Sequence, residues 1–493
     1  SAYDSSKSAS VVVTVSNGNV RIVPGRMNFG KRTTSRWPYV QPAHPQYATL
    51  TNTGSSALTI DSIAIVGTDV SAFNVTSECG STLDAGSSCT FHVQFQSRVV
   101  GSYTAAVEIV DSSADSPQRV NLSGVIGATV ATSVSAAMHD GWTVAAPRPM
   151  GESAVGTRVV RLVDSQRDDP YRANGTKREL MVRFWYPTPS DAACVPADYA
   201  SPAAWSYESQ LIRIAPPHVT TNSCLNAPVA PGSHPVVVFT HGFTGTFTDY
   251  TYLFEDLASR GYVVVSVDHT YDATIVEFPD GRLAKSVFGS HLTQYIRSDE
   301  EALTLAVSIR LDDLNFVLND LPRLNGAAGG DFAARLDLSR IAIGGHSLGG
   351  LTTLLAAEHD HRVKAGFALD VALPDHLGNV ISTPMLLLSA GRASWNVDDC
   401  HTWDALRGPR LALDLPGADH LAVTDAVWLL PNNALTGSAT STQTIAAVRS
   451  YVAGFLDTHL AGKGSQLSLT RASTAFPGVF LASSDRAQCG SAR

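Results

Sequence analysis

The spacing of hydrophobic residues divides the chain into two regions. Between residues 20 and 128 apolar and polar positions alternate, most clearly at 91–95 and 103–109, and Gly, Ser and Asp turns separate the runs at short intervals. Alternation of this kind places the apolar side chains on one face of a strand. The region therefore predicts an all-β sandwich of short antiparallel strands.

From residue 141 on, the pattern changes to continuous apolar runs separated by segments of helical periodicity. The predicted strands are 180–186, 235–240, 262–267, 340–344, 366–370, 384–389 and 410–415. The predicted helices are 250–259, 296–322, 351–357 and 443–458. Strands that alternate with helices predict a mainly parallel sheet covered on both faces. Residues 187–234, rich in Pro, Ala and Ser, are typical of a long loop.

These patterns predict five consecutive segments. They are a lead-in at 1–19, the sandwich at 20–128, a linker at 129–140, the α/β region at 141–462 and an irregular tail at 463–493. The 493 residues are too many for a single small core, so two or three domains are expected. The chain opens at Ser1, as expected of a processed mature protein or a trimmed one.

Composition narrows the range of partners. The net charge is −9, charged residues make up 16% of the chain, and no basic stripe is present. Nucleic acid is therefore not expected as a partner. No apolar run approaches the ~18 residues that a membrane-spanning helix needs, so no transmembrane segment is expected either.

The cysteines favour an oxidising compartment. None of the six has the close spacing of a zinc or redox motif, and they fall in neighbouring pairs. Proximity predicts the disulfides Cys79–Cys89, Cys194–Cys224 and Cys400–Cys489. A chain with such bridges is expected to be secreted or periplasmic. No metal site and no cofactor are expected.

The strongest chemical motif is Gly345-His346-Ser347-Leu348-Gly349, which lies between a predicted strand and a predicted helix. Strand, Gly-x-Ser-x-Gly and helix together form the nucleophile elbow of α/β-hydrolases. The glycines two residues before and after Ser347 allow neighbouring backbone to pass close to a very tight turn. The Ser347 hydroxyl is then expected at a helix N-terminus, where the helix dipole favours a developing negative charge.

A serine nucleophile needs a base, and in this fold the base follows the acid in the chain. His420 lies in a loop after the strand 410–415 and before the last helix, where it can reach the top of the sheet. His376 follows the acid-bearing strand too closely, His401 adjoins a cysteine, and His459 ends a helix. His420 is therefore the predicted general base.

The spacing leaves two positions open for the acid. Asp370 ends the strand that follows the nucleophile helix, whereas Asp398 and Asp399 follow the next strand. For the oxyanion, the predicted donors are the backbone N–H of Leu348, directly after the nucleophile, and the N–H of Phe243, after the strand 235–240.

The α/β region resembles the plasma-type platelet-activating-factor acetylhydrolase family, whose members are carboxylic ester hydrolases. The resemblance spans roughly 150–425 and is carried by residues 178–187, 235–242, 256–264, 345–350 and 368–370. It implies Asp370 as the acid and Phe243 and Leu348 as oxyanion donors. The loops 187–234 and 271–295 do not match, so the acyl preference of the family does not carry over.

The first region resembles the immunoglobulin-like modules of the ASH and choice-of-anchor D kind. The residues that carry this likeness are 27–30, 50–54, 83–89 and 122–124. Such a module indicates a fold and says little about function, so a spacer is the simplest expectation. Contact with a surface or a polymer through this sandwich is the alternative.

Together these features predict a secreted, metal-free serine esterase that forms an acyl-enzyme. The aromatic residues Phe243, Phe247 and Tyr250 are expected to line an apolar pocket, which favours short-acyl or aryl esters or exposed polyester chains. Packing of Phe247 and Tyr250 against the start of the next helix is the alternative for these two residues. A serine peptidase or amidase on the same fold is the first alternative, because the triad does not distinguish an ester from an amide. A non-catalytic surface-binding protein is the second.

Overall fold

The computed structural model describes residues 15–17, 19–33, 46–97, 101–127, 143–172, 175–212, 218–288, 299–371, 380–391, 402–430, 436–464, 469, 473–476 and 479–482. The chain divides into two compact units, residues 1–135 and 136–493.

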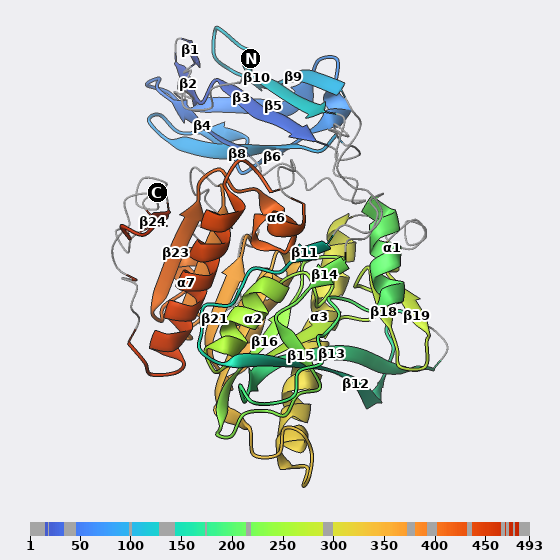
Figure 1. Ribbon diagram of the computed structural model, residues 1–493. Coiled ribbons are helices and arrows are strands. Elements are labelled where there is room, and N and C mark those ends of the chain that lie inside the picture. Colours follow the sequence, from blue (N-terminus) through green and yellow to red (C-terminus); the bar gives the residue numbers. More distant parts are fainter. Residues whose placement is uncertain are drawn as a thin grey trace. The chain divides into compact units, whose positions relative to one another are not determined.

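The first unit is an immunoglobulin-like β-sandwich of two five-stranded sheets (Figure 1). One sheet has the order β1 (Val15–Asn17), β2 (Val20–Val23), β4 (Gln46–Asn52), β8 (Ser88–Phe95) and β6 (Phe73–Ser77). The other has the order β3 (Arg26–Thr33), β10 (Gln118–Gly127), β9 (Gly101–Asp111), β5 (Leu58–Val66) and β7 (Thr82–Leu83). A short 3₁₀ turn, η2 (Val70–Ala72), precedes β6. The alternating Phe91, Val93 and Phe95 are buried in the core between the sheets, as the sequence pattern predicts.

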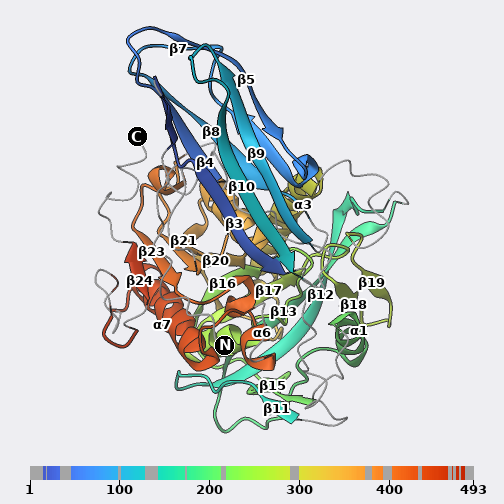
Figure 2. The same cartoon turned by 90° about the horizontal axis from the view of Figure 1, so that it is seen from above.

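The second unit has the α/β-hydrolase fold around a ten-stranded sheet within the described residues. Its strand order is β15 (Ser223–Leu225), β12 (Ala154–Asp168), β13 (Lys177–Thr188), β17 (Val263–Asp268), β16 (His234–Thr240), β20 (Leu336–His346), β21 (Val363–Leu369), β22 (Met385–Ala390), β23 (Arg410–Leu415) and β24 (Phe480–Ala482). The strands from β17 to β23 are parallel to one another, whereas β13 is antiparallel to β12 and β17. The sequence of strands across the sheet can be followed in Figure 2.

Helices cover both faces of this sheet (Figure 1). On one face, α2 (Thr251–Ser259) and α7 (Ser441–His459) share a core with Val237 and Phe239 of β16. On the other, α3 (Asp299–Gly326) and α4 (Leu348–His359) share a core with Val236 and Val238 of the same strand. A strand buried on both faces explains why the sequence pattern of β16 is continuously apolar.

The remaining elements lie around this framework. They are β11 (Thr143–Ala145), which pairs with β14 (His218–Thr220), α1 (Pro202–Ile212), the hairpin of β18 (Ile275–Glu277) and β19 (Leu283–Lys285), η5 (His420–Val423) and α6 (Ala426–Leu429).

Three sequence predictions need correction. The interpretation of 187–234 as loop is wrong in part, because α1, β14 and β15 lie there. The tail at 463–493 is not wholly irregular, because β24 pairs antiparallel with β23. The strand β12 was missed altogether. Charged residues at Arg158, Arg161 and Asp164 interrupt its apolar positions, so no continuous apolar run marks it, and pairing with β13 is what holds it in the sheet.

Two of the predicted disulfides are confirmed. Cys79 is bonded to Cys89 in the sandwich, and Cys194 is bonded to Cys224 of β15. The second bridge ties the Pro-rich segment to the edge of the large sheet, at a sequence separation of 30. Cys400 and Cys489 lie outside the described residues. None of the helices among the described residues is both long and apolar enough to cross a membrane.

Candidate active site

Ser347 lies in a strained turn between β20 and α4. Its φ and ψ are 55° and −120°, a conformation that is costly for a residue with a Cβ. The turn is held at both ends, because Ser347 N–H donates to the carbonyl of Leu369 (2.9 Å) and its own carbonyl accepts from Leu351 N–H (3.1 Å). Surrounding structure thus maintains the backbone strain, as expected of a nucleophile elbow.

The two motif glycines are required by close packing. A Cβ on Gly345 would lie 2.2 Å from the carbonyl oxygen of Gly349. A Cβ on Gly349 would lie 2.1 Å from the carbonyl oxygen of Thr240 and 2.6 Å from that of His241. The first turn of α4 therefore lies directly on the end of β16, which brings the loop after β16 next to the elbow.

His420 and Asp370 are in direct contact although they are 50 residues apart. The distance from His420 Nδ1 to Asp370 Oδ2 is 2.6 Å. Asp370 follows the end of β21 and is itself fixed, because its N–H donates to Leu388 O (2.6 Å) and its Oδ1 accepts from Ala390 N–H (2.9 Å). With Nδ1–H donating to the carboxylate, Nε2 of His420 is left as a hydrogen-bond acceptor.

The exposure of this pair suits proton transfer. The Asp370 side chain is 9% exposed and that of His420 is 25% exposed. His420 begins η5, where Asp419 Oδ1 accepts from His420 N–H (2.7 Å). Asp419 is thus a local turn former, as its position beside the histidine indicates. Asp398 and Asp399, the alternative acids, lie outside the described residues.

The predicted oxyanion donors lie on two elements that touch each other. Leu348 is the first residue of α4, whose first N–H groups have no carbonyl within the helix to bond. Phe243 follows β16 in the loop that passes beside the elbow. Both N–H groups therefore belong to backbone next to Ser347.

His346 and Tyr250 form a polar link that the sequence analysis missed. Gly242 N–H donates to the Tyr250 hydroxyl (3.0 Å), and this hydroxyl lies 2.9 Å from His346 Nδ1. His346 Nε2 lies 3.0 Å from the carbonyl oxygen of His420. These contacts assign the ring as neutral, with Nε2–H donating to His420 O and Nδ1 accepting from Tyr250.

Burial supports the neutral state of His346. Its removal from water and then the nearby charge of His420 lower the pKa of His346 to about 3. A neutral ring connects the loop after β16, the elbow and the loop of His420. In the sequence, the signal for this role is the histidine inside the Gly-x-Ser-x-Gly motif.

The predicted aromatic lining is wrong for one of its three residues. Tyr250 is buried and engaged in the link with Gly242 and His346, so it supports the backbone instead of lining a pocket. Phe247 is partly buried and packs against two core clusters. Phe243 lies against Phe288, with ring centroids 4.7 Å apart. Phe288 comes from the segment after β19, in a region that the sequence analysis left as unmatched loop.

No group of three or more potential metal ligands occurs among the described residues. The chemistry that this arrangement offers is that of a serine, an imidazole and a carboxylate beside backbone N–H groups.

Comparison with known proteins finds relatives of both units. Residues 150–306 match the family described as platelet-activating factor acetylhydrolase, isoform II, and residues 26–125 match a HYDIN/CFA65/VesB-like Ig-like domain. The structure of a ferulic acid esterase from Streptomyces cinnamoneus is 34% identical, covers 69% of this chain and 99% of that chain, and superposes with a TM-score of 0.57.

Two curated relatives are more distant. A probable 1-alkyl-2-acetylglycerophosphocholine esterase of Arthroderma benhamiae is 26% identical over 57% of this chain and 73% of its own length. A platelet-activating factor acetylhydrolase of Cavia porcellus is 27% identical over 40% of this chain and 50% of its own length.

The chain is therefore a serine carboxylic ester hydrolase of the α/β-hydrolase class. Within that class, it belongs with the esterases that contain the platelet-activating factor acetylhydrolase isoform II domain, here together with an N-terminal Ig-like domain.

Proposed function

We propose that Ser347 is the nucleophile, His420 the general base and Asp370 the residue that orients this base. The observation that carries the proposal is the 2.6 Å contact between His420 Nδ1 and Asp370 Oδ2, together with the strained turn at Ser347. The contact fixes the tautomer in which Nε2 accepts a proton.

In the first half-reaction, His420 Nε2 takes the proton of the Ser347 hydroxyl as its oxygen attacks the ester carbonyl. The negative charge that develops on the substrate oxygen is stabilised by the N–H groups of Leu348 and Phe243. The C–O bond to the leaving alcohol then breaks, and the alcohol takes the proton from the imidazolium of His420.

The second half-reaction repeats these steps with water. His420 removes a proton from the water, whose oxygen attacks the acyl carbon, and Ser347 leaves with that proton. The carboxylic acid is released and the enzyme is restored.

The proposed substrates are short-acyl or aryl esters, or exposed polyester chains. Two observations support this choice: the paired rings of Phe243 and Phe288 beside the oxyanion loop, and the acetyl and feruloyl esters named for the relatives.

Hydrolysis of p-nitrophenyl esters from acetate to palmitate, with and without an oil–water interface, tests the proposed substrate class. We expect kcat/KM to be highest at short chains and unaffected by the interface. A maximum at long chains with a jump at the interface would contradict it.

We further infer that the protein works in the periplasm or outside the cell. The two disulfides support this location, because such bridges are stable in oxidising compartments. Thiol labelling of the protein recovered from each compartment tests the inference. We expect most of the protein outside the cytoplasm, with Cys194 and Cys224 unreactive, and recovery of most of it from the cytoplasm with reactive thiols would count against the inference.

The central test is the pair of variants Ser347→Ala and His420→Ala. Each is expected to lower kcat by about 10⁶-fold, and the double variant should lose no more than either alone, because the residues act as one unit. Circular dichroism and the unfolding temperature control for an intact fold. Near-normal turnover by folded Ser347→Ala protein would overturn the mechanism.

A further inference from the structure

The loop His241–Thr244 contains the proposed oxyanion donor Phe243, and its orientation depends on two peptide planes. In a trans peptide the carbonyl and the following N–H point in opposite directions. The Phe243 N–H shares its peptide with the carbonyl of Gly242. Whatever fixes the Gly242 carbonyl therefore fixes the direction in which the Phe243 N–H points.

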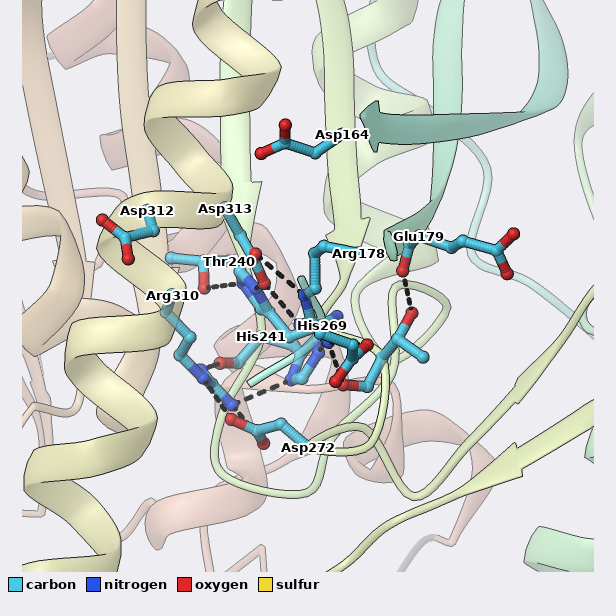
Figure 3. Close-up of polar contacts among 12 residues, drawn as sticks. Asp164, Arg178, Glu179, Thr240, His241, His269, Asp272, Arg310, Asp312 and Asp313 are labelled. Carbon is cyan, nitrogen blue, oxygen red and sulfur yellow. Dashed lines mark hydrogen bonds and ion pairs between the residues drawn. The ribbon is translucent and has the colours of Figure 1, made fainter. Parts of the chain in front are cut away.

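Arg310 of α3 binds this carbonyl. Figure 3 shows the same side chain beside His241 and Asp272. Its Nη2 donates to Gly242 O at 3.1 Å, and its Nη1 donates to His241 O. One guanidinium thus holds two consecutive carbonyls of the loop. The preceding peptide is fixed at its other end as well, because its Gly242 N–H donates to the Tyr250 hydroxyl.

His241 contributes a second side-chain donor to the same carbonyl, which also accepts from Gly245 N–H at 2.9 Å. Its Nδ1 lies 2.7 Å from Gly242 O, and its Nε2 lies 3.3 Å from the backbone N–H of His269. The His269 N–H makes Nε2 an acceptor, which leaves the ring proton on Nδ1 to donate to Gly242 O. Burial, and then the charge of Arg310, hold the pKa of His241 well below its usual value, so the ring stays neutral.

Arg310 is held by Asp272, the residue that orients the guanidinium. The two distances are 2.7 Å from Nε to Oδ2 and 2.8 Å from Nη2 to Oδ1, a paired geometry that a lysine cannot reproduce. Asp272 Oδ1 also accepts from Thr244 N–H at 3.3 Å, so the pair contacts the loop on both sides of Phe243. Neither Arg310 nor Asp272 is exposed to solvent.

A buried ion pair is a weak source of net stability, because removing both charges from water offsets their attraction. Stability alone therefore does not account for an arginine whose remaining donors point at two carbonyls of one loop. We propose that Arg310, oriented by Asp272, is a positioning residue that fixes the Phe243 N–H toward the oxyanion. This inference rests on the proposed function, since it presumes that Phe243 is an oxyanion donor.

The test compares a variant that keeps the positive charge at residue 310 with one that removes the charges of both Arg310 and Asp272. Arg310→Lys keeps the charge but lacks the fork that reaches Asp272 and both carbonyls. The double variant Arg310→Met/Asp272→Leu removes both charges, a change that buried ion pairs often tolerate without loss of stability. At least one of the two is thus expected to fold.

For each folded variant we expect kcat on p-nitrophenyl acetate to fall about 10- to 100-fold, as a misplaced oxyanion donor would cause. KM should change by less than about threefold, because the ground-state ester does not depend on the oxyanion contact. Affinity for a trifluoromethyl ketone, which forms a tetrahedral adduct with a serine, should fall in the same proportion as kcat/KM.

The matched control is Arg183→Lys. Arg183 is also buried and donates to two backbone carbonyls, those of Asp198 (2.9 Å) and Tyr199 (2.6 Å), but not to the loop 241–244. It should lose stability while keeping its kcat and ketone affinity. Unchanged kcat and ketone affinity in a folded Arg310 variant would overturn the inference. If Ser347→Ala stayed active, the proposed function itself would fail instead.

Discussion

The loop that contains His420 and the loop that contains Phe243 are held by different kinds of contact. His420 is one-quarter exposed and is positioned by hydrogen bonds that it donates to the carboxylates of Asp370 and Asp419, and by one that its carbonyl accepts from His346. The Phe243 loop is held from within the protein by Arg310 and Asp272, both fully buried.

This difference matches the tasks that we propose for the two loops. A general base exchanges protons with substrate and water, so its ring has to remain accessible. An oxyanion donor is effective when it is already oriented toward the position where negative charge develops, so it benefits from a rigid support. Of these two loops, the one that we propose to need fixed geometry is the one held by a buried ion pair.

The comparison between the two loops can be tested by substitution, and the largest effect on kcat is expected from Asp370→Asn. An amide at this position favours the wrong tautomer of His420, so kcat should fall by about 10⁴-fold while the fold is kept. The measurement is kcat over pH for a short ester.

Asp419→Asn is the control, since its side chain accepts from the backbone N–H of His420 (2.7 Å). Asp419→Asn should lower kcat only slightly. Asp398→Asn and Asp399→Asn should also lower kcat only slightly. If Asp398→Asn or Asp399→Asn lowered kcat more than Asp370→Asn does, the acid would be a residue of the segment after β22.

The sequence predicted much of this arrangement because its signals are local. A continuous apolar strand, two glycines and a serine define the elbow within a few residues, and chain order then limits the base to a late loop. The choice of Asp370 needed the resemblance to a family, because spacing alone left Asp398 and Asp399 open.

The supporting contacts could not be predicted in this way. Arg310, Asp272 and His241 are far apart in the chain, and each by itself resembles an ordinary charged or polar residue of a helix or loop. Their contacts with the loop 241–244 become visible only when α3 is packed against the end of β16. The strand β12 was missed for a related reason, since its pairing with β13 and not its own apolar content keeps it in the sheet.

A second test separates stability from positioning. Asp313 accepts from Arg178 (2.6 Å) and from His269 (2.9 Å) in a neighbouring buried network (Figure 3). The backbone N–H of His269 lies 3.3 Å from His241 Nε2, but Asp313 itself has no described hydrogen bond to the loop 241–244. Asp313→Asn removes one of the two carboxylates that contact the buried Arg178 and leaves Asp169 (3.1 Å), so the free energy of unfolding should fall by about 3 kcal/mol at pH 7. The kcat should change much less than in the Arg310 variants.

The same variant has a pH signature. Burial alone would raise the pKa of Asp313, but the charge of Arg178 and the hydrogen bonds from His269 and Arg178 outweigh it and lower this pKa. The pKa of Asp313 is thus lower in the folded protein than in the unfolded chain, where it is about 4. The ionised carboxylate therefore stabilises the folded protein fully above about pH 4, and this stabilisation is lost progressively as the pH falls from there toward the folded-state pKa. Urea unfolding between pH 7 and pH 3 should therefore show a shallower acid loss in Asp313→Asn than in the unmodified protein. Equal slopes would mean that Asp313 contributes no such linkage.

The smallest effect concerns the polar link between the two loops. Tyr250→Phe removes the hydroxyl that accepts from Gly242 N–H and contacts His346 Nδ1, while leaving the ring in the core. The Gly242 peptide keeps its carbonyl contact with Arg310, so its plane should loosen only partly. We expect kcat to fall about five- to tenfold with little change in KM, in line with the loss of one supporting hydrogen bond.

Tyr186→Phe is the matched control for this last change. Tyr186 is also buried, and its hydroxyl donates to the carbonyl of Ala227 at 2.8 Å, in a segment outside the two loops. Both variants lose one buried hydroxyl, so their unfolding temperatures should fall by similar amounts. Only Tyr250→Phe should lower kcat and weaken the trifluoromethyl ketone. If Tyr186→Phe lowered kcat equally, the effect of Tyr250 would be one of general stability, and Arg310 and Asp272 alone would support the oxyanion loop.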